Sequence, residues 1–132
     1  MLVYHYDFSS GVVDLVGNQN GTLFGDANVS GSRLNLDGNG DYVQFAESIV
    51  PTSGSYFVAL FGRRAANQAA FTEMISQGQS AGPGFCVGTN IAGNIRVGDQ
   101  WAVAGVPFGA VGQLTSYAVV VDAVAGTSKL YV

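Results

Sequence analysis

A glycine-rich turn between two alternating segments constrains this chain more than any other feature. Residues 33–45 read RLNLDGNGDYVQF. Apolar and polar residues alternate on both sides of the turn, which is typical of strands because successive side chains of a strand point to opposite faces. The glycines permit backbone conformations that other residues avoid, and Asn-Gly is a strong turn pair. The segment predicts two strands flanking a tight turn, with side-chain oxygens from Asp37, Asn39 and Asp41.

Composition and spacing extend this prediction to the whole chain. Charged residues make up only 11% of the 132 residues, whereas 19 are glycine, and this balance suits a sheet protein with many tight turns. No segment keeps an apolar period of 3.6 residues, and strand-like segments recur at intervals of roughly 8–12 residues. We therefore predict one all-β domain over residues 1–132, a two-sheet antiparallel sandwich. The expected strands include 2–8, 22–24, 55–61, 73–78, 84–88, 94–98, 116–122 and 127–132.

Two of these segments are nearly continuous in apolar character, which predicts central strands covered on both faces. They are residues 55–61 and 116–122. The predicted core takes its members from these segments, from the first strand and from the segment before the glycine-rich turn. It consists of Tyr4, Tyr6, Leu34, Leu36, Phe57, Ala59, Phe61, Val119 and Val121.

Charge and cysteine content exclude several classes of protein. The formal net charge is −4 with no basic stripe, so nucleic acid is not an expected partner. Cys86 is the only cysteine, which rules out a disulfide within the chain. No apolar run reaches the roughly 18 residues that a membrane span needs, and we see no signal peptide. We expect an extracellular or cell-surface protein, or alternatively a component of a virus particle.

Several motifs, taken in order, resemble those of laminin-G-like (concanavalin A-like) domains. Residues 14–23 resemble the family's D-x-S-G-N-G-N-x-G-T-L, and residues 34–43 resemble L-x-F-D-G-x-G-D-Y-V. Residues 74–78 resemble I-x-S-K-G, residues 117–122 resemble H-x-A-V-V-Y-D-G, and residues 129–132 resemble L-Y-V-N-G. The match covers nearly the whole chain, and the order of the motifs is more specific than any one of them. The resemblance implies a concanavalin A-like jelly roll that binds or displays.

Two departures from that pattern matter. Ser116-Tyr117 stands where the family often carries Trp-His-His, which has little functional weight. Family members also continue through further strands after L-Y-V-N-G, whereas this sequence stops at Val132. By the family pattern the sandwich is incomplete at its C-terminal end, and an open sheet edge invites another strand. Either the sequence is truncated, or a homo-oligomer or a neighbouring subunit covers that edge.

Calcium is the cofactor that the polar loops favour. Ca²⁺ takes six to eight oxygen ligands, and related sandwiches often hold it with loop carboxylates and amides. If the two polar loops meet, the ligands would be Asp14, Asn18, Asn20, Asp37, Asn39 and Asp41. The alternative is that these side chains only form Asx turns that cap the strands.

The remaining candidates concern function. Glycosidases on this fold need closely spaced carboxylates on one strand, and no strand here presents two acids at i, i+2. Because a Ser-His-Asp order and a metal-spaced His pair are also missing, we expect no enzyme. Trp101, assisted by Tyr42, is the candidate for stacking on a sugar, with a structural tryptophan as the alternative. We predict a non-catalytic recognition or adhesion module for carbohydrate or a protein partner, or alternatively a structural component of a phage virion.

Overall fold

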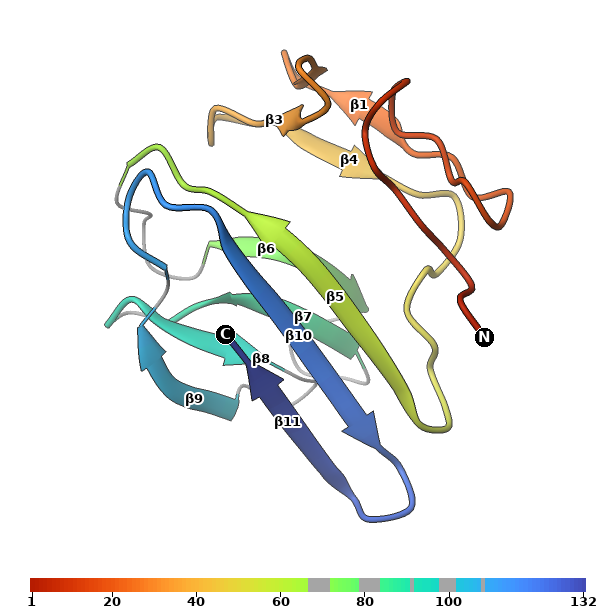
Figure 1. The fold of residues 1–132 in the computed structure, drawn as a ribbon, viewed down its shortest axis with the longest axis vertical. Coiled ribbons are helices and arrows are strands. Elements are labelled where there is room, and N and C mark those ends of the chain that lie inside the picture. Colours follow the sequence, from red (N-terminus) through yellow and green to blue (C-terminus); the bar gives the residue numbers. More distant parts are fainter. Residues whose placement is uncertain (67–71, 79–83, 91, 98–101, 108) are drawn as a thin grey trace. The chain divides into compact units, whose positions relative to one another are not determined.

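The chain is all-β, and it divides into two compact units, Met1–Ile49 and Val50–Val132. The computed structural model describes residues 1–66, 72–78, 84–90, 92–97, 102–107 and 109–132, with only the backbone described for 102–107. Eleven antiparallel strands and no helix occur in these residues (Figure 1). The all-β prediction is therefore confirmed.

The larger unit, Val50–Val132, contains two sheets in a sandwich-like arrangement (Figure 1). One sheet has the order β11-β10-β5 and the other has the order β6-β7-β8-β9. All neighbouring strands are antiparallel. The strands are β5 (Tyr56–Gly62), β6 (Glu73–Gly78), β7 (Gly84–Thr89), β8 (Asn94–Val97), β9 (Ala102–Pro107), β10 (Thr115–Asp122) and β11 (Thr127–Tyr131).

The core of this unit lies between the two sheets. The Tyr56 ring of β5 meets the Phe85 ring of β7 edge to face, with 6.1 Å between their centroids. Tyr117 and Val119 of β10 are buried, and their partners across the ladder are Leu60 and Val58 of β5. The other buried aliphatic side chains among the described residues of this unit are Val87, Ile95 and Val97 of β7 and β8, and Val50 before β5.

The prediction that the odd-numbered side chains of β5 belong to the core is wrong. Phe57 and Phe61 are 62% and 75% exposed, and Ala59 is exposed as well. Val119 is fully buried as predicted, and its ladder partner is Val58, so the even-numbered residues of β5 share the inward face. A continuous apolar run carries no alternation, so the sequence could not show which face turns inward.

An ion pair with a buried arginine links β8 to β6 across β7 of the four-stranded sheet. Arg96 of β8 is 2% exposed, and its Nη2 lies 2.6 Å from Oε1 of Glu73 on β6. Gly88 of β7 lies between them, paired with Glu73 on one side and Arg96 on the other. A Cβ at Gly88 would approach the Thr72 carbonyl oxygen to 2.6 Å. Glycine at this position therefore allows β6 and β7 to approach closely. Because it has no side chain, it also leaves room for the Arg96 side chain to cross β7 and reach Glu73.

The side-chain amide of Gln77 fixes the start of the larger unit by bonding to the backbone of Val50 as a neighbouring strand would. The Gln77 side chain accepts a hydrogen bond from Val50 N–H at 2.9 Å and donates one to the Val50 carbonyl at 2.7 Å. Val50 is 2% exposed, so both of its backbone groups need partners within the protein. The Gln77 amide supplies them in place of a neighbouring backbone.

The smaller unit, Met1–Ile49, has short strands and long connecting segments. β1 (Thr22–Phe24) pairs with β4 (Tyr42–Gln44), and β2 (Asn28–Val29) pairs with β3 (Leu34–Asn35). The glycine-rich turn therefore does not close a hairpin, because the strands on its two sides belong to different pairs. The turn connects two small ribbons instead.

The predicted strand over residues 2–8 is wrong, because this segment is irregular. Its backbone groups find partners in the loop that follows: His5 N–H donates to the Asp14 carboxylate, and Leu15 N–H donates to the His5 carbonyl. Tyr4 and Tyr6 are half-buried, and the Tyr6 ring contacts Phe45 at 5.1 Å between centroids. Leu34 is also half-buried, whereas Leu36 is 48% exposed, so the prediction of Leu36 as a core residue is wrong.

We expect Glu73→Ala to destabilise the protein strongly, because the Arg96 guanidinium would stay buried without its carboxylate. The expected loss in the free energy of unfolding is about 3 kcal/mol, the lower end for a buried pair, since a third of the Glu73 side chain is exposed. Glu47, the other glutamate, is exposed and bonds only to Gln19 among the described side chains. Glu47→Ala should cost less than about 0.5 kcal/mol in the same urea titration. Equal losses for the two variants would contradict the importance of the pair.

Candidate metal centre

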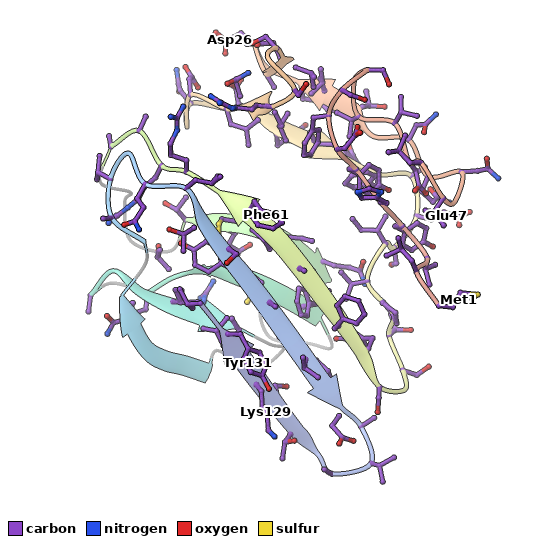
Figure 2. All side chains as sticks on the ribbon, in the orientation of Figure 1. Met1, Asp26, Glu47, Phe61, Lys129 and Tyr131 are labelled. Carbon is purple, nitrogen blue, oxygen red and sulfur yellow. The ribbon has the colours of Figure 1, made fainter. Side chains whose placement is uncertain are left out.

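Three carboxylates of the smaller unit converge on one site. Asp26 follows β1, whereas Asp37 and Asp41 bracket the glycine-rich turn between β3 and β4. One oxygen from each carboxylate lies within 4.8 Å of the other two. Asp26 is labelled in Figure 2. The same residues line a surface pocket of about 170 Å³ together with Asn28, Asn35 and Leu36.

Hydrogen bonds from backbone N–H groups fix the carboxylates of Asp37 and Asp41 and bring Asp26 against Asp41. The two oxygens of Asp41 accept separate bonds, Oδ1 from Asp26 N–H at 2.8 Å and Oδ2 from Asp37 N–H at 2.9 Å. Asp37 Oδ1 accepts a 2.7 Å bond from Asn39 N–H and so closes an Asx turn. Asp41 is therefore the centre of the cluster, because it binds the backbone of both of its neighbours.

Gly25 makes this approach possible. Its φ is +75°, in the left-handed region that favours glycine. A Cβ at this position would collide with the Asp41 carboxylate and would come within 2.9 Å of the Gly40 carbonyl oxygen. The short Gly25-Asp26 segment thus turns the chain out of β1 and brings Asp26 against Asp41.

Hydrogen bonds and mutual repulsion shift the pKa values of Asp26 and Asp41 in opposite directions. A hydrogen bond with the Asp41 side chain, together with the negative charges of Asp41 and Asp37, raises the pKa of Asp26. The Asp37 N–H lowers the pKa of Asp41, and the Asp26 side chain and backbone N–H add to that effect against a smaller opposing effect of desolvation. Asp26 is thus the first of the two to take up a proton as pH falls. A bound cation would relieve the same repulsion.

The structure groups two of the predicted ligands, Asp37 and Asp41. Asp14 is not a member of the cluster, because its carboxylate serves the backbone of its own loop. Oδ1 accepts from His5 N–H at 3.0 Å and from Val16 N–H at 3.1 Å, and Oδ2 accepts from Gln19 N–H at 3.3 Å. Although desolvation opposes it, this set of backbone donors lowers the pKa of Asp14.

The predicted amide ligands have varied surroundings. Asn20 Oδ1 accepts a 2.9 Å bond from Asp14 N–H, so this side chain supports the loop around Asp14. Asn18 is exposed in that same loop. Asn39 is exposed in the turn between Asp37 and Asp41.

Asp26 was missed by sequence reasoning. It lies far from the glycine-rich turn in sequence, and no motif marks it. The register of β1 on β4 pairs Phe24 with Tyr42, and this pairing brings the residues after β1 next to those before β4. Without knowledge of that register, the sequence could not predict that Asp26 and Asp41 lie close together.

An exposed aromatic pair adjoins the carboxylates. The rings of Phe24 and Tyr42 are stacked, with 4.8 Å between centroids and 4° between planes. They are 38% and 48% exposed, and Tyr42 follows Asp41 directly in sequence. Trp101, the other predicted ligand-stacking residue, lies outside the described residues.

The arrangement can hold a metal ion, since carboxylate oxygens are hard ligands and three of them face one another. Comparisons with protein families, with curated proteins and with solved structures find no match for this protein. Within the described residues, no helix has the length and apolar character that crossing a membrane requires.

Asp26→Asn should raise the melting temperature at pH 7 when a chelator is present. The asparagine amide can still donate to Asp41, while one of three adjacent negative charges is removed. The raised pKa of Asp26 means that its ionised form opposes folding, so the difference should shrink as pH falls through that pKa towards about 4. Thermal denaturation between pH 7 and pH 4 measures both effects. A variant less stable than wild type at pH 7 would refute them.

Asp14→Asn is the control of opposite sign. The lowered pKa of Asp14 means that its ionised form stabilises the fold above the unfolded value of about 4. The substitution should lower the melting temperature at pH 7, and the difference should narrow as pH falls through the lowered pKa.

Proposed function

We propose that this protein is a non-catalytic recognition module that binds carbohydrate, or a protein partner, at the β1–β4 end of its smaller unit with the help of Ca²⁺. The observation that carries the proposal is the joining of two features in one ribbon. Phe24 ends β1 and Tyr42 begins β4, and the acids lie just beyond these ends, Asp26 two residues after Phe24 and Asp41 immediately before Tyr42.

Exposed aromatic rings suit carbohydrate because the faces of a sugar carry C–H groups that stack on them. Each ring buries apolar area at a low cost in conformational entropy, and Tyr42 adds a hydroxyl that can donate or accept. Free ring surface next to polar side chains is the combination that an amphiphilic sugar requires. A protein partner presenting an apolar side chain beside a polar one would fit the same surface.

Calcium suits the carboxylates better than magnesium does. Ca²⁺ accepts irregular arrangements of six to eight oxygens, whereas Mg²⁺ demands near-octahedral geometry. The ligands here come from two turns, and Asn28 and Asn35 line the same pocket. Three carboxylates fill only part of a Ca²⁺ shell, so positions are left for water or for hydroxyl groups of a ligand.

The fold and location that we propose follow from the sequence. The order of motifs resembling laminin-G-like domains supports a concanavalin A-like jelly roll, an adhesive role and an extracellular or cell-surface location. The carboxylates of Asp37 and Asp41 accept hydrogen bonds from backbone N–H groups, which fix their positions and suit them to binding. A homo-oligomer or neighbouring subunit at the C-terminal edge belongs to the same proposal.

Millimolar Ca²⁺ should raise the melting temperature by roughly 5 °C, because an ion that binds only the folded state stabilises it by mass action. Asp41→Asn should abolish the shift, since Asp41 is the centre of the cluster. Asp7→Asn is the matched control, because Asp7 is exposed and, in the part of the chain that the structure describes, bonds to the nearby Ser9 rather than to the cluster. Equal shifts in all three proteins, or none in wild type, would leave these loops as turns without a metal.

A glycan array read with and without Ca²⁺ tests the ligand. We expect Ca²⁺-dependent binding that Tyr42→Ala reduces by about tenfold or more, since an aromatic contact and its buried area are lost. Tyr131→Ala is the control, because Tyr131 is a comparably exposed tyrosine on β11. An obligate trimer in solution with no glycan signal would favour the structural component of a phage virion instead.

A further inference from the structure

The sequence has two Asn-Gly pairs, and the fold treats them differently. They are Asn20-Gly21 and Asn39-Gly40. In such a pair the glycine nitrogen can attack the carbonyl carbon of the asparagine amide, because glycine has no side chain to hinder the approach. The new C–N bond closes a five-membered succinimide, and the original C–N bond of the amide breaks with loss of ammonia. Water then opens the ring to aspartate or isoaspartate, with no oxidant or reductant required.

The Asn20-Gly21 pair is protected by hydrogen bonds and packing. Gly21 N–H, the group that would attack, donates to the Val12 carbonyl at 2.9 Å. Asn20 Oδ1 is held by Asp14 N–H at 2.9 Å, so the side chain is not free to turn towards its own backbone. A Cβ at Gly21 would come within 2.6 Å of a Val12 methyl, which shows how closely the surroundings pack. Ring closure here requires local opening.

The Asn39-Gly40 pair lacks this protection. Both residues are exposed, and Gly40 has a φ of +82° with nothing within 4 Å of where a Cβ would lie. In the described part of the protein, no hydrogen bond engages the backbone N–H of Gly40 or the side-chain amide of Asn39. Asn39 N–H donates to the Asp37 carboxylate. This hydrogen bond restrains neither the Asn39 side chain, which must rotate, nor the Gly40 nitrogen, which must attack.

We propose that Asn39 is a site of spontaneous deamidation in the folded protein, whereas Asn20 is protected. The product places a further carboxylate in the turn between Asp37 and Asp41 and makes the net charge one unit more negative. An isoaspartate would also lengthen the backbone within a turn whose N–H groups bind both of those carboxylates. The modification does not depend on the proposed function, but its effect on Ca²⁺ binding does.

Peptide mapping by mass spectrometry tests the site. The full-length protein is incubated at 37 °C in mildly alkaline buffer, and the exchange of an amide NH₂ for OH is followed in the peptides that hold each pair. We expect Asn39 to convert at least about tenfold faster than Asn20, because only Asn20-Gly21 must first open locally. In urea the two pairs should convert at similar rates, since the unfolded state no longer protects either.

Two results would overturn the proposal. One is equal conversion of the two asparagines in the folded protein, and the other is an Asn39 that converts in urea but not in the native protein. Asn39→Gln is the matched control and should be stable, because glutamine would have to close a larger ring. Wild-type Asn39 should therefore convert faster than that glutamine.

The Asn39→Asp variant separates this inference from the proposed function. If Ca²⁺ binds at the cluster, the variant should show a larger calcium-induced rise in melting temperature than wild type, because the turn gains an oxygen ligand and a negative charge. If neither protein responds to Ca²⁺, the proposed metal site fails while the deamidation result stands on the mass data alone.

Discussion

Backbone N–H groups that lie outside the strands must find acceptors, and this requirement organises much of the molecule. The smaller unit has strands of only two or three residues, so ladder bonds satisfy few of its backbone groups. Carboxylates take over that task. Asp14 gathers donors from His5 and from its own loop, and Asp41 ties Asp26 to Asp37. In the larger unit Gln77 does the same for Val50 with a neutral amide.

This structural task limits what the acids can do for a ligand. Both oxygens of Asp41 already accept a backbone hydrogen bond, so a cation would use their remaining lone pairs. These hydrogen bonds hold the cluster in place without a metal. The carboxylates therefore repel one another before any ion binds. A hydrogen bond with the Asp41 side chain, together with that repulsion, raises the pKa of Asp26, and a proton or a cation can relieve the repulsion. In contrast, the charge of Asp14 is engaged by four backbone donors, which leaves little of it for a metal.

The sequence predicted what depends on local pattern and failed where distant pairing decides. The strands at 22–24 and 73–78 have the predicted bounds, because turn residues flank them in the sequence. The segment 2–8 alternates like a strand, but its partner is a loop held by Asp14. The inward face of β5 followed from its register on β10, which no local pattern reveals. Asp26 joined the site for the same reason, through the register of β1 on β4.

The position of the protein's single lysine has a consequence for how the larger unit meets other strands. Lys129 lies in the middle of β11, which is one of the two edge strands of the described three-stranded sheet. Figure 2 shows the side chains of Lys129 and Tyr131 along this strand. Two copies pairing through β11 alone would bring two ammonium groups together, so a homo-oligomer that covers this edge would do so with another part of the second copy. A foreign strand with an acidic residue opposite Lys129 would meet attraction instead, which makes the edge selective by charge.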